Sequence, residues 1–209
     1  LDAKMDAAVS RLLAGEPLAY VLGEWEFYGL PLYVDHNVLI PRDDTCAVAA
    51  LAIDQALFLG QNPRILDLCT GSGCIAWTLA LEIPGAEVTA VDISDEALAV
   101  ASSQDFTEEI ARTGAIAPRF IKADVLAGPL DELGKFDIIV SNPPYVMDSE
   151  KAMMRKNVLD HEPHMALFVP DADPLVFYRA VADHASELLA PDGFGVVEIN
   201  EALGEETAE

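Results

Sequence analysis

The chain has 209 residues, of which 52% are hydrophobic and 23% are charged, a composition typical of one globular domain or of one domain with part of a second. No apolar run reaches the roughly 18 residues that a membrane-spanning helix needs, and the first residues lack a signal-peptide pattern. With 36 acidic and 12 basic residues, the formal net charge of −24 disfavours a nucleic-acid substrate, because Lys and Arg hold the phosphate backbone.

The first sixty residues predict a helix, a hairpin and a second helix. Residues 4–14 carry apolar side chains at helical spacing, and the sequence from Gly15 to Pro17 ends that helix. Residues 26–28 and 31–34 flank a Gly-Leu turn and predict a β-hairpin. Residues 43–58 are dominated by Ala, Val and Leu and predict the second helix.

From residue 63 onward, short apolar runs alternate with helical patterns. We expect strands at 64–68, 87–91, 119–122, 136–141 and 193–199, and helices at 73–82, 94–112 and 174–189. Strands that alternate with helices of this length predict an α/β fold, with a mostly parallel sheet and helices on both faces.

The first of these strands leads into a loop of small residues that a helix follows. In parallel sheets, ligands bind beyond the carboxyl ends of the strands, beside the first strand. Small residues let a ligand approach the backbone closely. The loop lacks both the dinucleotide fingerprint and the P-loop motif, so a generic tight turn is the alternative. The candidate cofactor residues here are Asp67, Cys69, Thr70, Gly71, Ser72 and Gly73.

Two further strand ends carry carboxylates. Asp92 ends the second strand and is placed to accept both hydroxyls of an adenosine ribose. Its alternative role is a helix cap, but Ser94 already supplies one. Asp124 and Val125 follow the third strand and would reach an adenine edge, with an exposed loop acid as the alternative for Asp124. Together these residues predict a cofactor that contains adenosine.

The fourth strand runs directly into Asn142-Pro143-Pro144-Tyr145, the most specific segment of the chain. The prolines remove two backbone donors and leave carbonyls free to accept, including that of Pro143. Asn142 adds a side-chain carbonyl, and Tyr145 adds a flat ring. This set is suited to holding a planar NH2 group by both hydrogens. A proline-rich loop without function is the alternative.

The cysteines and histidines suggest no metal or catalytic set. Cys46, Cys69 and Cys74 have no metal-ligand spacing and are expected to be buried free thiols. His161 and His164 flank Pro163, and we expect them to have a loop role.

At this point the chain resembles the HemK/PrmC family, the glutamine methyltransferases of peptide-chain release factors. Residues 15–20, 26–32 and 38–42 are similar to the linker and hairpin of that family. The loop at 67–73, Asp92 and the Asn-Pro-Pro-Tyr segment are similar to its methyltransferase motifs. The resemblance covers essentially all 209 residues.

The resemblance implies a Rossmann-like methyltransferase that uses S-adenosylmethionine, releases S-adenosylhomocysteine and needs no metal. The substrate would be the glutamine of the Gly-Gly-Gln loop in class-one release factors. Asn142 and Pro143 would hold the amide beside Pro144, Tyr145 would pack on it, and Asn142 would also contact the cofactor. The enzyme would be a cytoplasmic monomer that acts on a protein, without direct contact with nucleic acid or membrane.

The resemblance also implies a domain organisation. Residues 1–22 would be the end of a helical substrate-recognition domain and its linker, and residues 23–209 would be the methyltransferase domain with its hairpin. We expect both ends of the sequence to be cut, with the last strands of the sheet beyond Glu209.

Two departures leave alternatives open. Cys69 stands where the family usually has Gly, and with Cys74 it is reminiscent of sister enzymes that methylate a glutamine of a large-subunit ribosomal protein. Cys46 replaces the final acid of a family motif, which leaves its contact with the cofactor in question. Asn-Pro-Pro-Tyr also occurs in methylases of adenine in nucleic acid. A non-catalytic binding module is the last alternative.

Overall fold

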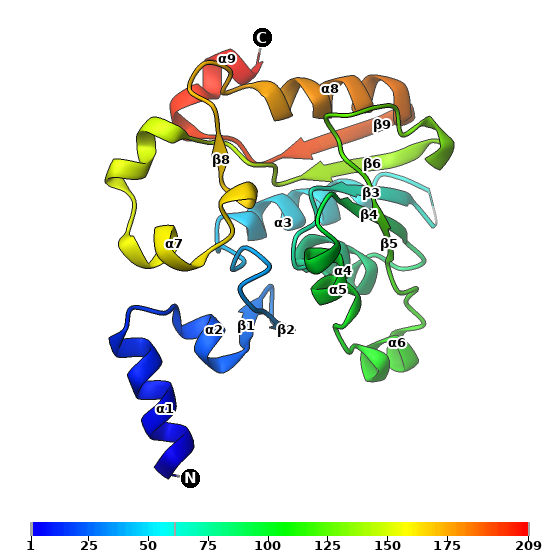
Figure 1. Ribbon diagram of the computed structural model, residues 1–209. Coiled ribbons are helices and arrows are strands. Elements are labelled where there is room, and N and C mark those ends of the chain that lie inside the picture. Colours follow the sequence, from blue (N-terminus) through cyan, green and yellow to red (C-terminus); the bar gives the residue numbers. More distant parts are fainter. Residues whose placement is uncertain (1, 61, 209) are drawn as a thin grey trace.

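The computed structural model describes residues 2–60 and 62–208, and its centre is one sheet of parallel strands (Figure 1). The strand order is β5-β4-β3-β6-β9. The order reverses at β3, which is the position where α/β sheets bind their ligands. The predicted α/β fold is therefore confirmed. The strands are β3 (Arg64–Leu68), β4 (Glu87–Asp92), β5 (Arg119–Lys122), β6 (Phe136–Ser141) and β9 (Leu189–Val197).

The strand register brings the predicted motifs to one edge of the sheet. Leu68 at the end of β3 lies opposite Val91 of β4 and opposite Ser141 of β6. Asp92 in turn lies opposite Lys122 of β5. Because these strands are parallel and end at the same level, the segments that follow them meet at their carboxyl ends.

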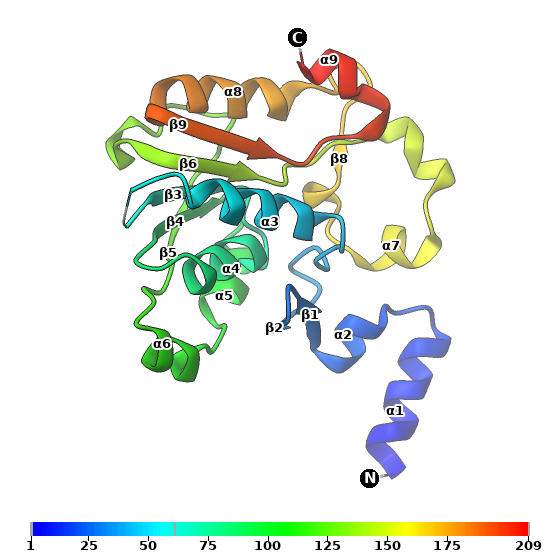
Figure 2. The ribbon, with the colours of Figure 1, turned by 180° about the vertical axis from the view of Figure 1, so that it is seen from behind.

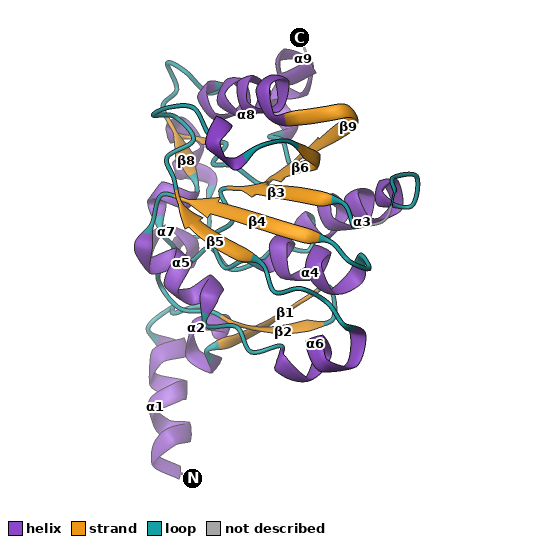
Figure 3. Cartoon of the chain, turned by 90° about the vertical axis from the view of Figure 1, so that its right-hand side faces the viewer, coloured by secondary structure: helices purple, strands orange, loops and turns teal. Residues whose placement is uncertain are grey.

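Helices cover both faces of the sheet, as predicted. On one face, Ile65 packs in a core with helices α3 (Thr45–Ala56) and α4 (Cys74–Glu82). On the other face, Leu66 packs with helix α8 (Val176–Leu188). Figure 3 shows α8 on one side of the sheet and α3 and α4 on the other. In the view from behind in Figure 2, α3 lies in front of the sheet.

The single helix expected at 94–112 is wrong, because the segment forms two helices. These are α5 (Asp95–Ser102) and α6 (Thr107–Thr113). Between them the amide of Gln104 accepts from the N–H of Tyr33 and donates to its carbonyl, each at 2.9 Å. Phe106 packs against Trp77 with ring centroids 5.0 Å apart and the ring planes tilted by 52°. These tertiary contacts outweigh the local helical preference.

Strand β9 begins four residues before the predicted start at residue 193. Leu189 already pairs with Phe136, and the register then shifts before Ile138 pairs with Phe194. Asp192, with φ of +67°, occupies this irregular stretch. The Pro-Asp-Gly sequence there is typical of a turn, so it concealed a strand that contains an irregularity.

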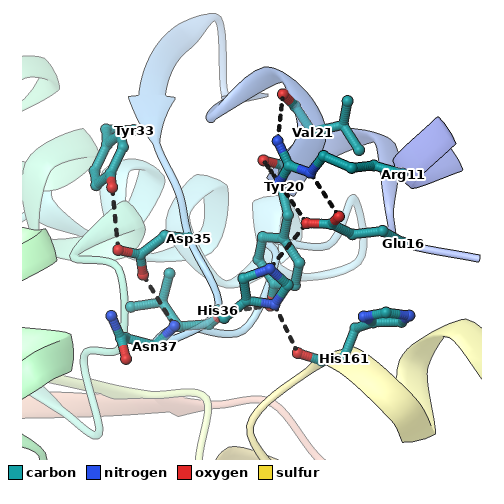
Figure 4. Close-up of polar contacts among 10 residues, drawn as sticks. Arg11, Glu16, Tyr20, Val21, Tyr33, Asp35, His36, Asn37 and His161 are labelled. Atoms are coloured by element: carbon teal, nitrogen blue, oxygen red, sulfur yellow. Dashed lines mark hydrogen bonds and ion pairs between the residues drawn. The ribbon is translucent and has the colours of Figure 1, made fainter. Parts of the chain in front are cut away.

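The N-terminal segment forms a helix, a short second helix and the predicted hairpin. The elements are α1 (Asp2–Leu13), α2 (Leu18–Leu22), β1 (Glu24–Phe27) and β2 (Leu30–Tyr33). Helix α2 was not predicted. No described residue of α1 is buried. Its connection to the body is polar: Figure 4 shows Glu16 between Arg11 and His36, and the Nδ1 atom of His36 lies 3.3 Å from the carbonyl of His161. Arg11 donates to Glu16 and holds the pKa of that carboxyl at about 2.

The segment from β7 to β8 leaves the sheet edge and returns to it. Strands β7 (Val146–Met147) and β8 (Phe168–Val169) pair in parallel, and helix α7 (Lys156–His161) lies between them (Figure 1). The remaining elements are helix α9 (Gly204–Ala208) and four 3-10 turns, η1 (Asp131–Leu133), η2 (Asp148–Met153), η3 (His164–Ala166) and η4 (Glu201–Leu203). Within the described residues, every helix is too short or too polar to cross a membrane.

Candidate active site

The loop after β3 passes through three left-handed backbone positions. The φ angle is +62° at Cys69, +57° at Gly71 and +79° at Gly73. The N–H of Thr70 donates to the carbonyl of Val91 at 3.0 Å, which links the loop to the end of β4. The loop therefore turns tightly above the sheet edge, in the position predicted for a ligand-binding turn.

The two glycines of this loop have different roles. A Cβ on Gly71 would meet nothing within 4 Å, so this position faces open space. A Cβ on Gly73 would lie 3.0 Å from the Cβ of Ala101 and 3.1 Å from Cδ1 of Trp77. Gly73 therefore allows α4 to pack closely against α5, and it lies outside the cavity that Gly71 lines.

Asp92 connects the loop to the next helix. Its Oδ2 accepts the N–H of Gly71 at 2.8 Å, and its Oδ1 accepts the N–H of Ser94 at 3.0 Å. Ser94 caps α5, because its Oγ accepts the N–H of Ala97 at 3.1 Å. Each carboxylate oxygen can accept a second hydrogen bond, so Asp92 keeps acceptor capacity for a ligand.

Asp67 lies behind the loop and is fully buried. Its Oδ2 accepts the hydroxyl of Thr70 at 2.6 Å, whereas its Oδ1 has no hydrogen-bond partner among the described residues. The pKa of Asp67 is raised to about 7, mainly by burial and to a smaller extent by the charge of Asp92. Asp67 does not line the cavity, and it supports the loop through Thr70.

A cavity of about 300 Å³ opens at this edge of the sheet. Among the described residues that line it, Asp92 and Asp124 are acidic and Arg42 is the one basic side chain. Such a lining repels phosphates and favours a cationic ligand. The predicted cofactor residues in its wall are Cys69, Thr70, Gly71, Ser72, Asp92, Asp124, Val125 and Asn142.

A histidine that the sequence pattern did not indicate contacts the backbone of the loop after β5. The Nε2 atom of His184 lies 2.9 Å from the carbonyl of Val125, and His184 is buried in α8. Asp124 accepts the N–H of Leu126 at 2.9 Å. Both Asp124 and Val125 are thereby fixed at the cavity wall.

A second cavity of about 40 Å³ adjoins the first. Pro143, Tyr145 and Glu198 line this smaller cavity, whereas Pro144 lines the larger one. Asn142 lines both, as do Leu39, Arg42 and Ala166. The Asn-Pro-Pro-Tyr segment thus lies between the two spaces.

Hydrogen bonds hold the side chains of this segment. Asn142 donates through Nδ2 to the hydroxyl of Thr45 at 3.0 Å, and Thr45 donates to Oε2 of Glu198 at 2.6 Å. The hydroxyl of Tyr145 donates to Oε1 of Glu198 at 2.8 Å. Burial raises the pKa of Tyr145, and the neighbouring Glu198 carboxylate raises it further.

Sequence reasoning did not identify Thr45 or Glu198. Glu198 could have been found by the argument that identified Asp92, because it is a carboxylate near the carboxyl end of a predicted strand. Asn200, two residues further on, donates to the carbonyl of Tyr145 at 3.1 Å. The end of β9 therefore holds Tyr145 through both its hydroxyl and its backbone.

Arg42 reaches both cavities from the linker after the hairpin. It donates to Oε1 of Glu162 at 2.6 Å, and the Glu162 side chain is only 1% exposed. Glu162 also accepts the N–H of Ile40 at 3.1 Å. This buried carboxylate thus fixes the linker against the segment between β7 and β8.

The cysteines are free, as expected, but only Cys74 is buried, while Cys46 and Cys69 are half-buried. Both Cys69 and Cys74 line the larger cavity. The loop position expected for the two histidines is wrong for His161, which ends helix α7, whereas His164 begins the 3-10 turn η3. Within the described part of the chain, no group of three or more His, Cys, Asp or Glu is arranged to hold a metal ion.

Comparison with known proteins gives consistent findings. The family model of the methyltransferase small domain matches residues 47–165. The chain is 44% identical to the release factor glutamine methyltransferase of Flavobacterium psychrophilum over 206 residues, which is 98% of this chain and 70% of that protein. It is 43% identical to the enzyme of the same name from Bacteroides thetaiotaomicron, again over 206 residues, with 97% of this chain and 70% of that protein covered.

Among solved structures, a SAM-dependent methyltransferase from Agrobacterium tumefaciens has a similar fold. The TM-score is 0.51 at 19% identity, with 83% of this chain and 51% of the other covered. At this identity the likeness concerns the fold, which is that of class I SAM-dependent methyltransferases.

Proposed function

Since this chain belongs to the family of release factor glutamine methyltransferases, we propose that its two adjoining cavities are the cofactor site and the amide site of that reaction. The reaction is the S-adenosylmethionine-dependent methylation of a glutamine side-chain amide in a release factor. The observation that carries the proposal is that Asn142 lines both cavities. One residue can therefore contact both the methyl donor and the amide.

The larger cavity suits S-adenosylmethionine in charge as well as in position. This cofactor has a sulfonium, an ammonium and a carboxylate, but it has no phosphate, and the acidic lining favours such a ligand. Asp92 would accept the ribose hydroxyls, and Asp124 with the backbone of Val125 would meet the adenine edge. Arg42 is the described basic side chain in reach of the carboxylate. When bound, the cofactor supplies an electrophilic methyl group and leaves as S-adenosylhomocysteine.

The smaller cavity would receive the glutamine amide. Oδ1 of Asn142 and the carbonyl of Pro143 would accept its two N–H groups, and the ring of Tyr145 would pack on its plane. No described residue donates a hydrogen bond to either acceptor, so both are available. Holding both hydrogens raises the electron density on a poorly nucleophilic nitrogen and directs its lone pair.

Orientation accounts for most of the acceleration that we expect, since holding reactants in place contributes roughly 7–11 kcal/mol in well-aligned intramolecular reactions. The amide nitrogen gains the methyl carbon and loses one proton to solvent. Because the proton can leave after the transfer, the chain needs no strong base, and the proposal includes no metal.

The size of the second cavity argues against the adenine alternative. Its volume of about 40 Å³ exceeds the roughly 10–15 Å³ that one water requires, and it suits the three heavy atoms of an amide group. A flipped adenine has ten heavy atoms and would need a basic channel for its strand. The net charge of −24 opposes such a channel.

We propose further that residues 1–22 end a helical substrate-recognition domain and that residues 23–209 form the methyltransferase domain. The exposed apolar residues of α1 support this, with Met5 61% and Leu13 84% exposed on a helix that buries no described residue. The proposed enzyme acts as a monomer in the cytoplasm on a protein substrate, without nucleic acid or membrane.

The experiment that tests the function is methyl transfer from labelled S-adenosylmethionine to a purified class-one release factor. The control is the same factor with the glutamine of its Gly-Gly-Gln motif replaced by alanine. Label on the unaltered factor alone supports the proposal. Label on neither factor, with cofactor still bound, contradicts it, and label on a large-subunit ribosomal protein would then establish the sister activity instead.

A further inference from the structure

Three segments that are distant in the sequence meet beside Asn142. Thr45 begins α3, Asn142 follows β6 and Glu198 follows β9. The backbone N–H of Glu198 donates to the carbonyl of Ser141 at 3.0 Å, which fixes Glu198 beside the residue before Asn142. Thr45 lies between the two side chains and is only 1% exposed. The three side chains thus form a continuous chain of hydrogen bonds.

The direction of each hydrogen bond in this chain follows from the chemistry of the groups. A carboxylate can only accept, so the hydroxyl hydrogen of Thr45 is committed to Oε2 of Glu198. The Thr45 oxygen can then only accept from Asn142, which must present its NH2 group. The carbonyl Oδ1 of Asn142 is therefore forced away from Thr45.

We infer that Glu198 is a positioning residue that acts through Thr45 to fix the amide of Asn142 with its carbonyl toward the substrate. The inference rests on the proposed function. Without Glu198, the hydroxyl of Thr45 could donate to Asn142, and the amide could rotate by 180°. Asn142 would then present its own NH2 group to the NH2 group of the glutamine, and the two donors could not pair.

The same carboxylate fixes Tyr145. Its Oε1 accepts the Tyr145 hydroxyl at 2.8 Å, so each oxygen of Glu198 controls one side chain of the amide site. This arrangement sets specificity as well as rate. A substrate glutamate would present only acceptors to Oδ1 of Asn142 and the carbonyl of Pro143, and the site would reject it.

Three substitutions test the inference in the release-factor methylation assay. Thr45→Val keeps the shape but removes the hydroxyl, Thr45→Ser keeps the hydroxyl, and Glu198→Gln allows the chain of hydrogen bonds to reverse. We expect kcat to fall about 100-fold in Thr45→Val, about tenfold in Glu198→Gln, and less than about threefold in Thr45→Ser. Glu198 lines only the smaller cavity, so cofactor affinity in Glu198→Gln should stay near the wild-type value.

Thr78→Val is the matched control for the loss of a buried threonine hydroxyl. Thr78 is fully buried and donates to the carbonyl of Cys74 within α4, outside both cavities. Its turnover should stay at the wild-type level. If Thr45→Ser is as slow as Thr45→Val, or if Glu198→Gln and Thr45→Val both turn over like the wild type, the inference is wrong.

A measurement without substrate separates this inference from the proposed function. In protein labelled with 15N-asparagine, the side-chain NH2 signal of Asn142 can be assigned by its absence in Asn142→Ala. We expect its hydrogen exchange to be about tenfold faster in Thr45→Val than in the wild type or Thr45→Ser. Equal exchange in all three overturns the inference. A wild-type enzyme that transfers no methyl group, yet shows the expected exchange, contradicts only the proposed function.

Discussion

Oδ2 of Asp92 accepts the backbone N–H of Gly71 over 2.8 Å, across the ends of two neighbouring strands. Its other oxygen accepts the N–H of Ser94 at the start of α5. One carboxylate thus holds the cofactor loop and the following helix together, in addition to the role that we propose for it toward the ribose.

Asp92→Asn should weaken cofactor binding by about 10- to 100-fold, because a hydrogen bond to a charged group contributes about 1.5–3 kcal/mol. Calorimetric titration with S-adenosylhomocysteine measures this effect. Asp95→Asn is the control, since Asp95 lies three residues away with its side chain 69% exposed. Equal affinities in the two variants would remove Asp92 from the cofactor site.

Asn142→Ala should abolish methyl transfer while leaving cofactor affinity within a few-fold. The substitution removes an acceptor for the substrate amide, and small losses of alignment cost about 100-fold or more in rate. Single-turnover transfer to the release factor, with cofactor affinity measured separately, gives both quantities. Wild-type turnover in this variant would refute the role of Asn142 in holding the amide.

The two glycines of the cofactor loop should respond differently to alanine. Gly71→Ala meets open space and should cost only the left-handed strain, about 1–2 kcal/mol. Gly73→Ala adds close contacts with Ala101 and Trp77, which cost about 1–3 kcal/mol more. For a chain of this size the additional loss lowers Tm by about 2–4 °C per kcal/mol. Thermal unfolding of the two variants checks that Gly73→Ala has the lower Tm. Equal Tm values would show that α4 shifts to accommodate the added methyl group at no cost.

The buried Asp67 should make stability depend on pH. Its pKa is raised from the ordinary 3.8 to about 7 in the folded protein, mainly by burial. Between these values the folded state holds a proton that the unfolded state has lost, so stability falls as pH rises from about 4 to about 7. Above pH 7 both states are ionised, and this contribution stays constant.

Asp67→Asn should remove that dependence. The difference between the free energy of unfolding of this variant and that of the wild type, measured in urea, should shift in favour of the variant by up to about 1.4 kcal/mol per pH unit between pH 5 and 7. Above pH 7 this difference should stay constant. Gln55→Ala, a change of an exposed and uncharged side chain on α3, serves as the control for the general pH response. Parallel curves for Asp67→Asn and the wild type would show that Asp67 does not titrate in this range.

The fold and the cavity wall could be predicted from local patterns. Asp92 and Asn142 each stand at the end of an apolar run, and parallel strands bring such ends to one edge of the sheet. A sequence pattern is enough for this because the register of parallel strands aligns their ends. Eight of the ten predicted cofactor residues line the larger cavity, which supports that reasoning.

The positioning residues could not be predicted in this way. Thr45 lies 97 positions from Asn142 and 153 positions from Glu198, and their contact depends on where α3 crosses the sheet. Asp67 and Gly73 show the opposite error, because they were predicted to contact the cofactor but do not line the cavity. Both belong to the predicted loop, but burial and packing, which the sequence pattern does not reveal, place them outside the cavity.

The break between α5 and α6 has a consequence for the edge of the hairpin. Gln104 bonds both the N–H and the carbonyl of Tyr33 on strand β2, and its amide also donates to the carbonyl of Ser72. A single side chain thereby satisfies the N–H and the carbonyl of Tyr33, which could otherwise pair with a neighbouring strand. Unpaired strand edges invite pairing with other chains, and Gln104 closes the edge of β2 to such pairing at Tyr33.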